Sequence, residues 1–154
     1  MSGSKKPVSV LVLIHTAGTS PQVLLLERAA HFGFWQSVTG SQESEEPLPA
    51  TALRELREET GIIATPDQLQ DWQHSNRYEI FAEWRHRYPA NVTHNVEHVF
   101  SLCLADARAI RIAPDEHRAY RWLPWRAAAE ACFSWTNGDA IRMLGLAAES
   151  LQQT

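Results

Sequence analysis

The sequence has few cysteines, and its acidic residues outnumber its basic ones. Only two of its 154 residues are cysteine, Cys103 and Cys132, and they form no CxxC pair. A disulfide framework or a cysteine-bound zinc ion is therefore not expected. The 14 Lys and Arg residues against 18 Asp and Glu give a formal net charge of −4, and no basic stripe suits nucleic acid. An anionic ligand would have to be met by local cations or a metal ion, and not by the overall field.

Long hydrophobic runs are also missing. No run reaches the roughly 18 apolar residues of a membrane-spanning helix, and the opening MSGSKKPVSV leaves no room for a signal peptide before the first strand-like run. We therefore expect a cytoplasmic protein with neither a membrane nor a nucleic acid as its partner. The length suits a single domain, which we place at residues 5–150. The sequence does not report the oligomeric state.

The most informative stretch is residues 40–62, GSQESEEPLPATALRELREETGI. Residues 54–60 contain no Gly, Pro or Asn, which favours a helix, and Gly61 stands where a left-handed C-cap is expected. Side chains three and four positions apart share one face of a helix, so this helix presents one acidic stripe. The stripe consists of Glu55, Glu58 and Glu59. Leu53 and Leu56 are expected to point the other way, toward a core.

Clustered carboxylates repel one another unless a cation lies among them. Hard oxygen ligands suit Mg²⁺ or Mn²⁺, whereas most acidic stripes are simply solvated helix faces. Two observations favour the metal here. Gly40 and Glu46 stand at fixed intervals upstream, and Arg54 is placed to hold a carboxylate in position. The spacing does not say whether Glu46 reaches the metal or fixes the loop.

Together these residues match the Nudix box, G-x5-E-x7-R-E-U-x-E-E-x-G-U with U aliphatic, without a departure. The chain thus resembles the Nudix hydrolases, which cleave nucleoside diphosphates linked to another group. The resemblance implies an α/β fold in which a mixed β-sheet is sandwiched between helices, an α/β/α sandwich. It also implies Mg²⁺-dependent hydrolysis, with Mn²⁺ as a substitute, of a small-molecule triphosphate.

Stretches outside the box are similar to one Nudix subfamily, the dihydroneopterin triphosphate pyrophosphatases of bacteria. The most distinctive is FWQSVTGS at residues 34–41, and weaker ones include HRY at 86–88, EH at 116–117 and SW at 134–135. The implied reaction hydrolyses dihydroneopterin triphosphate to the monophosphate and pyrophosphate. The nearest alternative is a housecleaning pyrophosphatase acting on purine or oxidised purine nucleoside triphosphates, because pterin and guanine share a donor–acceptor edge. A silent Nudix domain is disfavoured, since every box glutamate is present.

The resemblance also implies roles for individual residues. Glu55 and Glu59, one turn apart, are the first candidates for metal ligands, and Glu58 is an additional one. The remote Glu116 is expected to fold over the metal site, as a ligand or as a general base. Which of Glu58, Glu59 and Glu116 takes the proton stays open. Arg54 is expected to orient a box glutamate.

Substrate contacts are expected from the rest of the chain. Candidate phosphate contacts are Lys5 and Arg28, and Thr39 could bond a phosphate or the pterin. The candidates for an edge that reads the pterin through its backbone are Tyr78, Glu79, Ile80 and Phe81, with stacking from Phe81 or Trp35. Ser134 is a weaker candidate. The seven histidines show no metal-binding spacing, so structural or surface roles are expected for them.

Hydrophobic patterning predicts the remaining elements. Strands are expected at residues 7–14, 22–28, 69–74, 78–87, 96–105 and 118–123, with a short one near 34–38. Helices are expected at 125–131 and 137–150. Gly145 lies inside the second of these and disfavours its last turns, because Gly costs about 1 kcal/mol relative to Ala in a helix.

Overall fold

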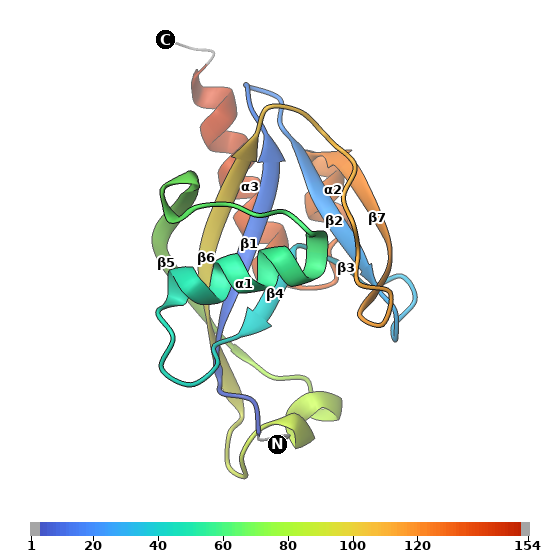
Figure 1. Ribbon diagram of the computed structural model, residues 1–154. Helices are drawn as coiled ribbons and strands as arrows, with labels where there is room; N and C mark the ends of the chain where they lie inside the picture. Colours follow the sequence, from blue (N-terminus) through green and yellow to red (C-terminus); the bar gives the residue numbers. More distant parts are fainter. Residues whose placement is uncertain (1–3, 152–154) are drawn as a thin grey trace.

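The structure is a computed structural model that describes residues 4–151, and it consists of one mixed β-sheet between layers of helices (Figure 1). The strands are β1 (Val8–Thr16), β2 (Gln22–Arg28), β3 (Trp35–Gln36), β4 (Val38–Ser41), β5 (Leu69–Glu79), β6 (His94–Leu104) and β7 (His117–Pro124). The α-helices are α1 (Leu48–Thr60), α2 (Trp125–Ala131) and α3 (Trp135–Ser150), and short 3-10 helices are η1 (Pro66–Gln68) and η2 (Ala82–Arg87). Helix α1 covers one face of the sheet, while α2 and α3 cover the other. The expected α/β/α sandwich is confirmed.

Strand β1 lies at the centre of the sheet. It runs parallel to β6 and antiparallel to β2 and β4, and the main strand order is β3-β2-β1-β6-β5, with β7 pairing with β2. Its side chains alternate between two cores: Val10 and Val12 face α1, and Leu11 and Leu13 face α2 and α3. Burial on both faces explains why β1 is a nearly continuous apolar run.

Helix α1 carries the acidic stripe and ends as its sequence predicts. Gly61 has φ 75°, and its N–H donates to the Arg57 carbonyl at 2.9 Å. Leu56 is fully buried against the sheet, as expected, whereas Leu53 is only partly buried. Within the stripe, Glu59 is buried, Glu55 is half-buried and Glu58 is exposed.

The predicted strand at residues 78–87 is wrong. Strand β5 ends at Glu79, and η2 follows it. The segment repeats every three residues and not every two, since Phe81 and Trp84 lie on one side of the 3-10 turn with ring centroids 5.1 Å apart. The gap expected between residues 74 and 78 is also absent, because β5 passes through it with a bulge near Gln73, whose φ is 51°.

Helix α3 continues through Gly145 without a break. A Cβ atom at this position would overlap the ring of Trp125 on α2. The glycine therefore permits close packing of α2 against α3, which explains its place inside a helix. Within residues 4–151, no helix is long and apolar enough to cross a membrane, and both cysteines are free thiols.

Candidate active site

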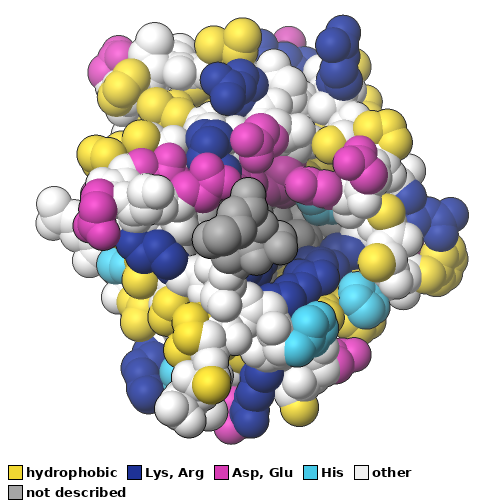
Figure 2. All heavy atoms as spheres, turned by 60° about the horizontal axis from the view of Figure 1, so that its bottom comes forward, with side chains coloured by type: hydrophobic (Ala, Val, Ile, Leu, Met, Phe, Trp, Pro, Cys, Tyr) yellow, Lys and Arg dark blue, Asp and Glu magenta, His cyan; other side chains and the backbone are white. Residues whose placement is uncertain are grey.

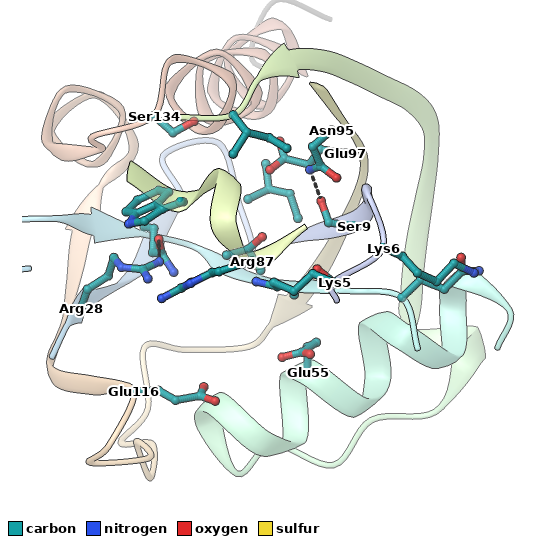
Figure 3. A pocket seen from close by; sticks show the side chains of 18 of the residues that line it. Lys5, Lys6, Ser9, Arg28, Glu55, Arg87, Asn95, Glu97, Glu116 and Ser134 are labelled. Carbon is teal, nitrogen blue, oxygen red and sulfur yellow. Dashed lines mark hydrogen bonds between the residues drawn. The ribbon is translucent and has the colours of Figure 1, made fainter. Parts of the chain in front are cut away.

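A cavity of about 1060 Å³ opens beside the C-terminal half of α1. Its walls come from α1, the start of β1, β4, η2 and the loop that precedes β7. Figure 2 shows acidic side chains along one rim of this hollow and Lys and Arg side chains across from them. In the close view, Glu55 and Glu116 lie on one side, and Lys5, Arg28 and Arg87 lie on the other (Figure 3).

The acidic side is centred on Glu59, which is only 1% exposed. Glu59, Glu116 and His117 each offer one ligand atom, and these atoms all lie within 4.8 Å of one another. The turn that carries Glu116 is held against β2 by a hydrogen bond from Ala29 N–H to the Glu116 carbonyl, 2.9 Å long. The pairing of β7 with β2 places His117 opposite Arg28. A residue remote in sequence thus reaches the helix, as expected for Glu116.

The environment of Glu59 suits a divalent cation. Burial raises the pKa of Glu59 well above its usual range, and the hydrogen bond with Glu55 and the charges of Glu55 and Glu116 raise it further. Its Oε1 atom is buried and has no hydrogen-bond partner within residues 4–151. A cation at this point would satisfy that oxygen and relieve the repulsion, so the residues present fit a metal ion.

His117 was missed in the sequence, where all histidines were expected to be structural or at the surface. Its Nε2 atom lies 3.7 Å from Glu59 Oε1. Burial and the charge of Arg28 lower the pKa of His117 to about 4, so the ring is neutral near pH 7 and the contact is no ion pair. A neutral imidazole keeps a lone pair for a metal or a water. The EH pair at residues 116–117 was the available signal, but it did not distinguish His117 from the other histidines.

Gly40 makes room for Glu55. A Cβ atom at residue 40 would overlap the Glu55 carboxyl group. Strand β4 and helix α1 can therefore approach each other only because the box begins with a glycine. Glu55 is thereby held beside Glu59, to which it is hydrogen-bonded.

Arg54 organises the acidic loop, as the sequence indicates. Its guanidinium donates to Glu46 Oε1 at 2.7 Å and to Glu55 Oε1 at 2.8 Å, and it lies 3.5 Å from Glu58 Oε2. Glu46 also accepts from Glu43 N–H and from the Thr51 hydroxyl, both at 2.9 Å. The Arg54 hydrogen bond is the main reason that the pKa of Glu46 falls to about 2. Of the two roles left open for Glu46, the observed contacts are those of a residue that fixes the loop.

The basic side contains Lys5, Arg28 and Arg87. Lys5 N–H donates to the Arg87 carbonyl at 2.8 Å, which ties the N-terminal segment to the end of η2. Burial lowers the pKa of both Lys5 and Arg28, and so does their proximity to Arg87. The Arg28 guanidinium lies 4.8 Å from the centre of the Trp84 ring, and its buried Nε atom has no hydrogen-bond partner within residues 4–151. Three cations held together in this way favour an anion between them.

Arg87 was not among the predicted site residues, although Lys5 and Arg28 were. Its position depends on η2, which the sequence patterning mistook for a strand. The HRY stretch at residues 86–88 carried the signal, but a strand assignment gave no reason to choose Arg87 over its neighbours.

The other predicted substrate contacts also line the cavity, in different ways. The Thr39 hydroxyl donates to the Val10 carbonyl at 3.0 Å, and the Thr39 backbone is hydrogen-bonded to Glu59. The Ser134 hydroxyl is hydrogen-bonded to Thr136 at 2.9 Å. Tyr78 accepts a hydrogen bond from Asn95 at 3.0 Å.

The segment from Glu79 to Phe81 also lines the cavity. Both backbone groups of Ile80 are engaged, with Thr93 at 2.8 Å and Arg85 at 3.1 Å, and Glu79 pairs with Arg85 at 3.0 Å. Phe81 is 45% exposed and belongs to an aromatic wall with Trp84 and Phe133. Trp35, considered as a stacking residue, packs instead into the core beneath α2 and α3.

The family model described as "NUDIX domain" matches residues 5–144. A dihydroneopterin triphosphate diphosphatase of Escherichia coli (strain K12) is 45% identical over 139 residues, which cover 89% of this chain and 91% of that protein. One from Haemophilus influenzae is 39% identical over 140 residues, covering 90% and 87%.

Solved structures agree with these sequence matches. The E. coli dihydroneopterin triphosphate pyrophosphohydrolase superposes with a TM-score of 0.85 at 43% identity, covering 93% of this chain and 97% of that one. A protein from Listeria monocytogenes shares the fold, with a TM-score of 0.74 at 23% identity over 91% of this chain and 92% of its own.

Proposed function

The chain belongs to the Nudix hydrolase family, and from that membership we propose that its cavity binds dihydroneopterin triphosphate and hydrolyses it to dihydroneopterin monophosphate and pyrophosphate. One observation supports this most strongly: the cavity brings an acidic cluster around Glu59 face to face with Lys5, Arg28 and Arg87. A triphosphate fits between them, because its oxygens can bond the cations on one side and a metal ion on the other.

We propose Mg²⁺, with Mn²⁺ as a substitute, as the cation of the acidic side. Glu55 and Glu59 would be its first ligands, Glu58 would add one directly or through water, and Glu116 would be a further ligand or the general base. Bound there, the ion would screen the polyphosphate and lower the pKa of an attacking water. Arg54 acts as a positioning residue, since it holds the Glu55 carboxylate from behind.

Side chains of the protein would bind the phosphates and accept the proton of the attacking water. Lys5 and Arg28 bind the phosphates, and Arg87 joins them on the basic side. Glu116 is exposed at the cavity rim and is open to solvent, so it is placed to accept a proton from water, with Glu58 and Glu59 as the other candidates. We propose that residues 5–150 form the single domain carrying this activity and that it acts in the cytoplasm on a small-molecule substrate.

The proposal is tested by comparing kcat/KM for dihydroneopterin triphosphate with kcat/KM for purine nucleoside triphosphates. We expect purified protein with Mg²⁺ to release pyrophosphate from dihydroneopterin triphosphate with a higher kcat/KM than from dGTP, dATP or 8-oxo-dGTP. A tenfold preference for a nucleotide, which corresponds to about 1.4 kcal/mol of transition-state binding, would replace the folate-pathway reaction by the housecleaning one. Failure to release pyrophosphate from any of these triphosphates would indicate a silent domain.

A further inference from the structure

Two polar side chains occupy core positions of β6 at the end of the cavity away from the acidic cluster. Asn95 and Glu97 are two residues apart, so they share one face of the strand, and they are only 1% and 5% exposed. The next residue on that face, Val99, belongs to the apolar core beneath α2 and α3. Both polar side chains line the cavity beside Ser9 of β1 (Figure 3).

Both side chains have a free acceptor oxygen. Asn95 Oδ1 and Glu97 Oε1 are buried and have no hydrogen-bond partner within residues 4–151. The Asn95 amide nitrogen donates to the Ser9 hydroxyl at 2.8 Å and to the Tyr78 hydroxyl at 3.0 Å, which fixes the amide plane and commits both of its N–H groups. Buried acceptors without donors are unfavourable. A ligand that satisfies them must bring hydrogen-bond donors, and the N–H groups of a flat heterocycle are donors of this kind.

The Glu97 carboxyl group is also held from behind. A hydrogen bond from the Thr136 side chain lowers its pKa, while the larger effect of burial raises the pKa to about 7. Thr136 is itself hydrogen-bonded to Ser134 at the start of α3. Near neutral pH the group can therefore become a carboxylate when donors approach, and one carboxylate can accept two parallel N–H bonds.

We propose that Glu97 reads the substrate ring by accepting hydrogen bonds from a ring N–H and the adjacent exocyclic amine of a 2-amino-4-oxopyrimidine edge, while Asn95 Oδ1 accepts the second amine hydrogen. This inference rests on the proposed function, because it assigns the far end of the same cavity to the ring of the same substrate. Pterin and guanine carry this edge. Adenine has an acceptor nitrogen beside its amine, which a carboxylate repels.

The walls of the cavity suit a flat ring. Phe81, Trp84 and Phe133 line it, with Trp84 and Phe133 at 6.0 Å between centroids. Aromatic side chains stack on any heterocycle, so this wall would favour a ring without choosing between pterin, guanine and adenine. Discrimination is left to the acceptors of Glu97 and Asn95.

Glu97→Gln tests the assignment, because it keeps the shape of the side chain and turns one acceptor into a donor. We expect kcat/KM for dihydroneopterin triphosphate and for dGTP to fall about 10- to 100-fold. For dATP it should be unchanged or higher, since an amide pairs with the donor–acceptor edge of adenine. Glu130→Gln, the same change at an exposed position of α2, is the matched control and should leave all three values unchanged.

Binding of a phosphate-free pterin separates the inference from the hydrolytic reaction. Without metal, we expect neopterin to bind Glu97→Gln at least tenfold more weakly than wild type, with Tm confirming that the variant is folded. Should the variant misfold, Glu97→Asp keeps the carboxylate but withdraws it by one methylene, and is expected to weaken neopterin binding as well.

The outcomes are distinct. Equal losses on dGTP and dATP, or unaltered neopterin binding by the folded variants, would overturn the role of Glu97 even if the wild type hydrolyses dihydroneopterin triphosphate as proposed. If the wild type prefers dGTP to the pterin substrate and Glu97→Gln still shifts the dGTP to dATP ratio, the edge assignment holds and the folate-pathway reaction does not.

Discussion

On the acidic side of the cavity, carboxyl groups are buried next to one another, which disfavours their ionised form. Glu59 is buried beside Glu55 and Glu116, and its pKa is raised by burial first and by these neighbours next. Neutralising such a carboxyl with a proton is the alternative to neutralising it with a cation. The buried Glu59 carboxylate is therefore a strong ligand for a divalent ion. Carboxyl groups in clefts whose pKa is strongly shifted often mark functional sites for this reason.

Glu59→Gln is expected to lower kcat by about a hundredfold or more while leaving Tm nearly unchanged. The amide keeps the packing of the side chain but removes a negative charge from the metal-binding cluster. Steady-state kinetics with Mg²⁺ and a thermal melt without it measure the two quantities. A rate close to that of the wild type would remove Glu59 from the catalytic site.

Glu116→Ala is expected to reduce kcat more than it raises KM. The residue is exposed on a turn, so its loss disturbs no core, and its carboxylate lies within 4.8 Å of the ligand atoms of Glu59 and His117. Asp106→Ala, a carboxylate on another exposed loop, is the matched control and should keep wild-type kinetics. Unaltered kinetics of Glu116→Ala would make Glu116 an ordinary loop residue.

Gly40→Ala is expected to impair catalysis through Glu55. The added methyl group would overlap the Glu55 carboxyl and push it away from Glu59, so we expect kcat/KM to fall about tenfold or more. In a Glu55→Ala background the obstacle is gone, and the same change should then have little further effect. Additive losses in this double-mutant cycle would show that Gly40 acts by another route.

At the scale of elements, the sequence predicts those helix and strand boundaries that depend on nearby residues. The acidic helix ends at its expected C-cap Gly61, although it begins earlier than residue 54, and β2 and α2 have their expected bounds. Helix η2 was mistaken for a strand, because the alternation in YEIFAEWRHR suits either period over so short a run. Arg87 was missed with it.

The rest of the site depends on contacts between elements. His117 enters it because β7 pairs with β2, and no spacing along the chain encodes that pairing. Glu97 lies on the same face of β6 as Val99, which packs beneath α2 and α3. The apolar Val96 and Phe100 lie on the opposite face, so the sequence alone does not say which face turns toward those helices. The box predicts the acidic residues of α1, whereas the tertiary structure is needed to bring Asn95, Glu97 and Glu116 to the same cavity.

Gly145→Ala tests the packing of α2 against α3. In an isolated helix the change would stabilise by about 1 kcal/mol, but here the methyl group would overlap the Trp125 ring. We expect a net loss of about 1–3 kcal/mol in the free energy of unfolding, measured by urea denaturation. In a Trp125→Ala background the sign should reverse, because the helix propensity remains and the overlap does not. A stabilised single variant would contradict the close approach.

The molecule as a whole separates charge of the two signs across one cavity. The chain is net acidic at −4, yet Lys5, Arg28 and Arg87 gather on one side, where burial and then the charge of Arg87 lower the pKa of Lys5 and Arg28. On the other side the carboxylates repel. Each cluster is unfavourable alone, and both are relieved when a cation and a polyphosphate bind together. Ligand binding should therefore be coupled to global stability.

Magnesium is expected to raise Tm in a manner that depends on Glu59. A ligand that binds only the folded state adds RT ln(1 + [L]/Kd), about 2.7 kcal/mol at a hundred times Kd. For a chain of this size that is a rise of about 5–10 °C. Calorimetric scans with increasing MgCl₂, reversed by EDTA, measure it. In Glu59→Gln the rise should be largely lost, whereas Glu130→Gln, which carries the same substitution on α2, should retain it; an equal rise in both variants would place the ion away from the acidic cluster.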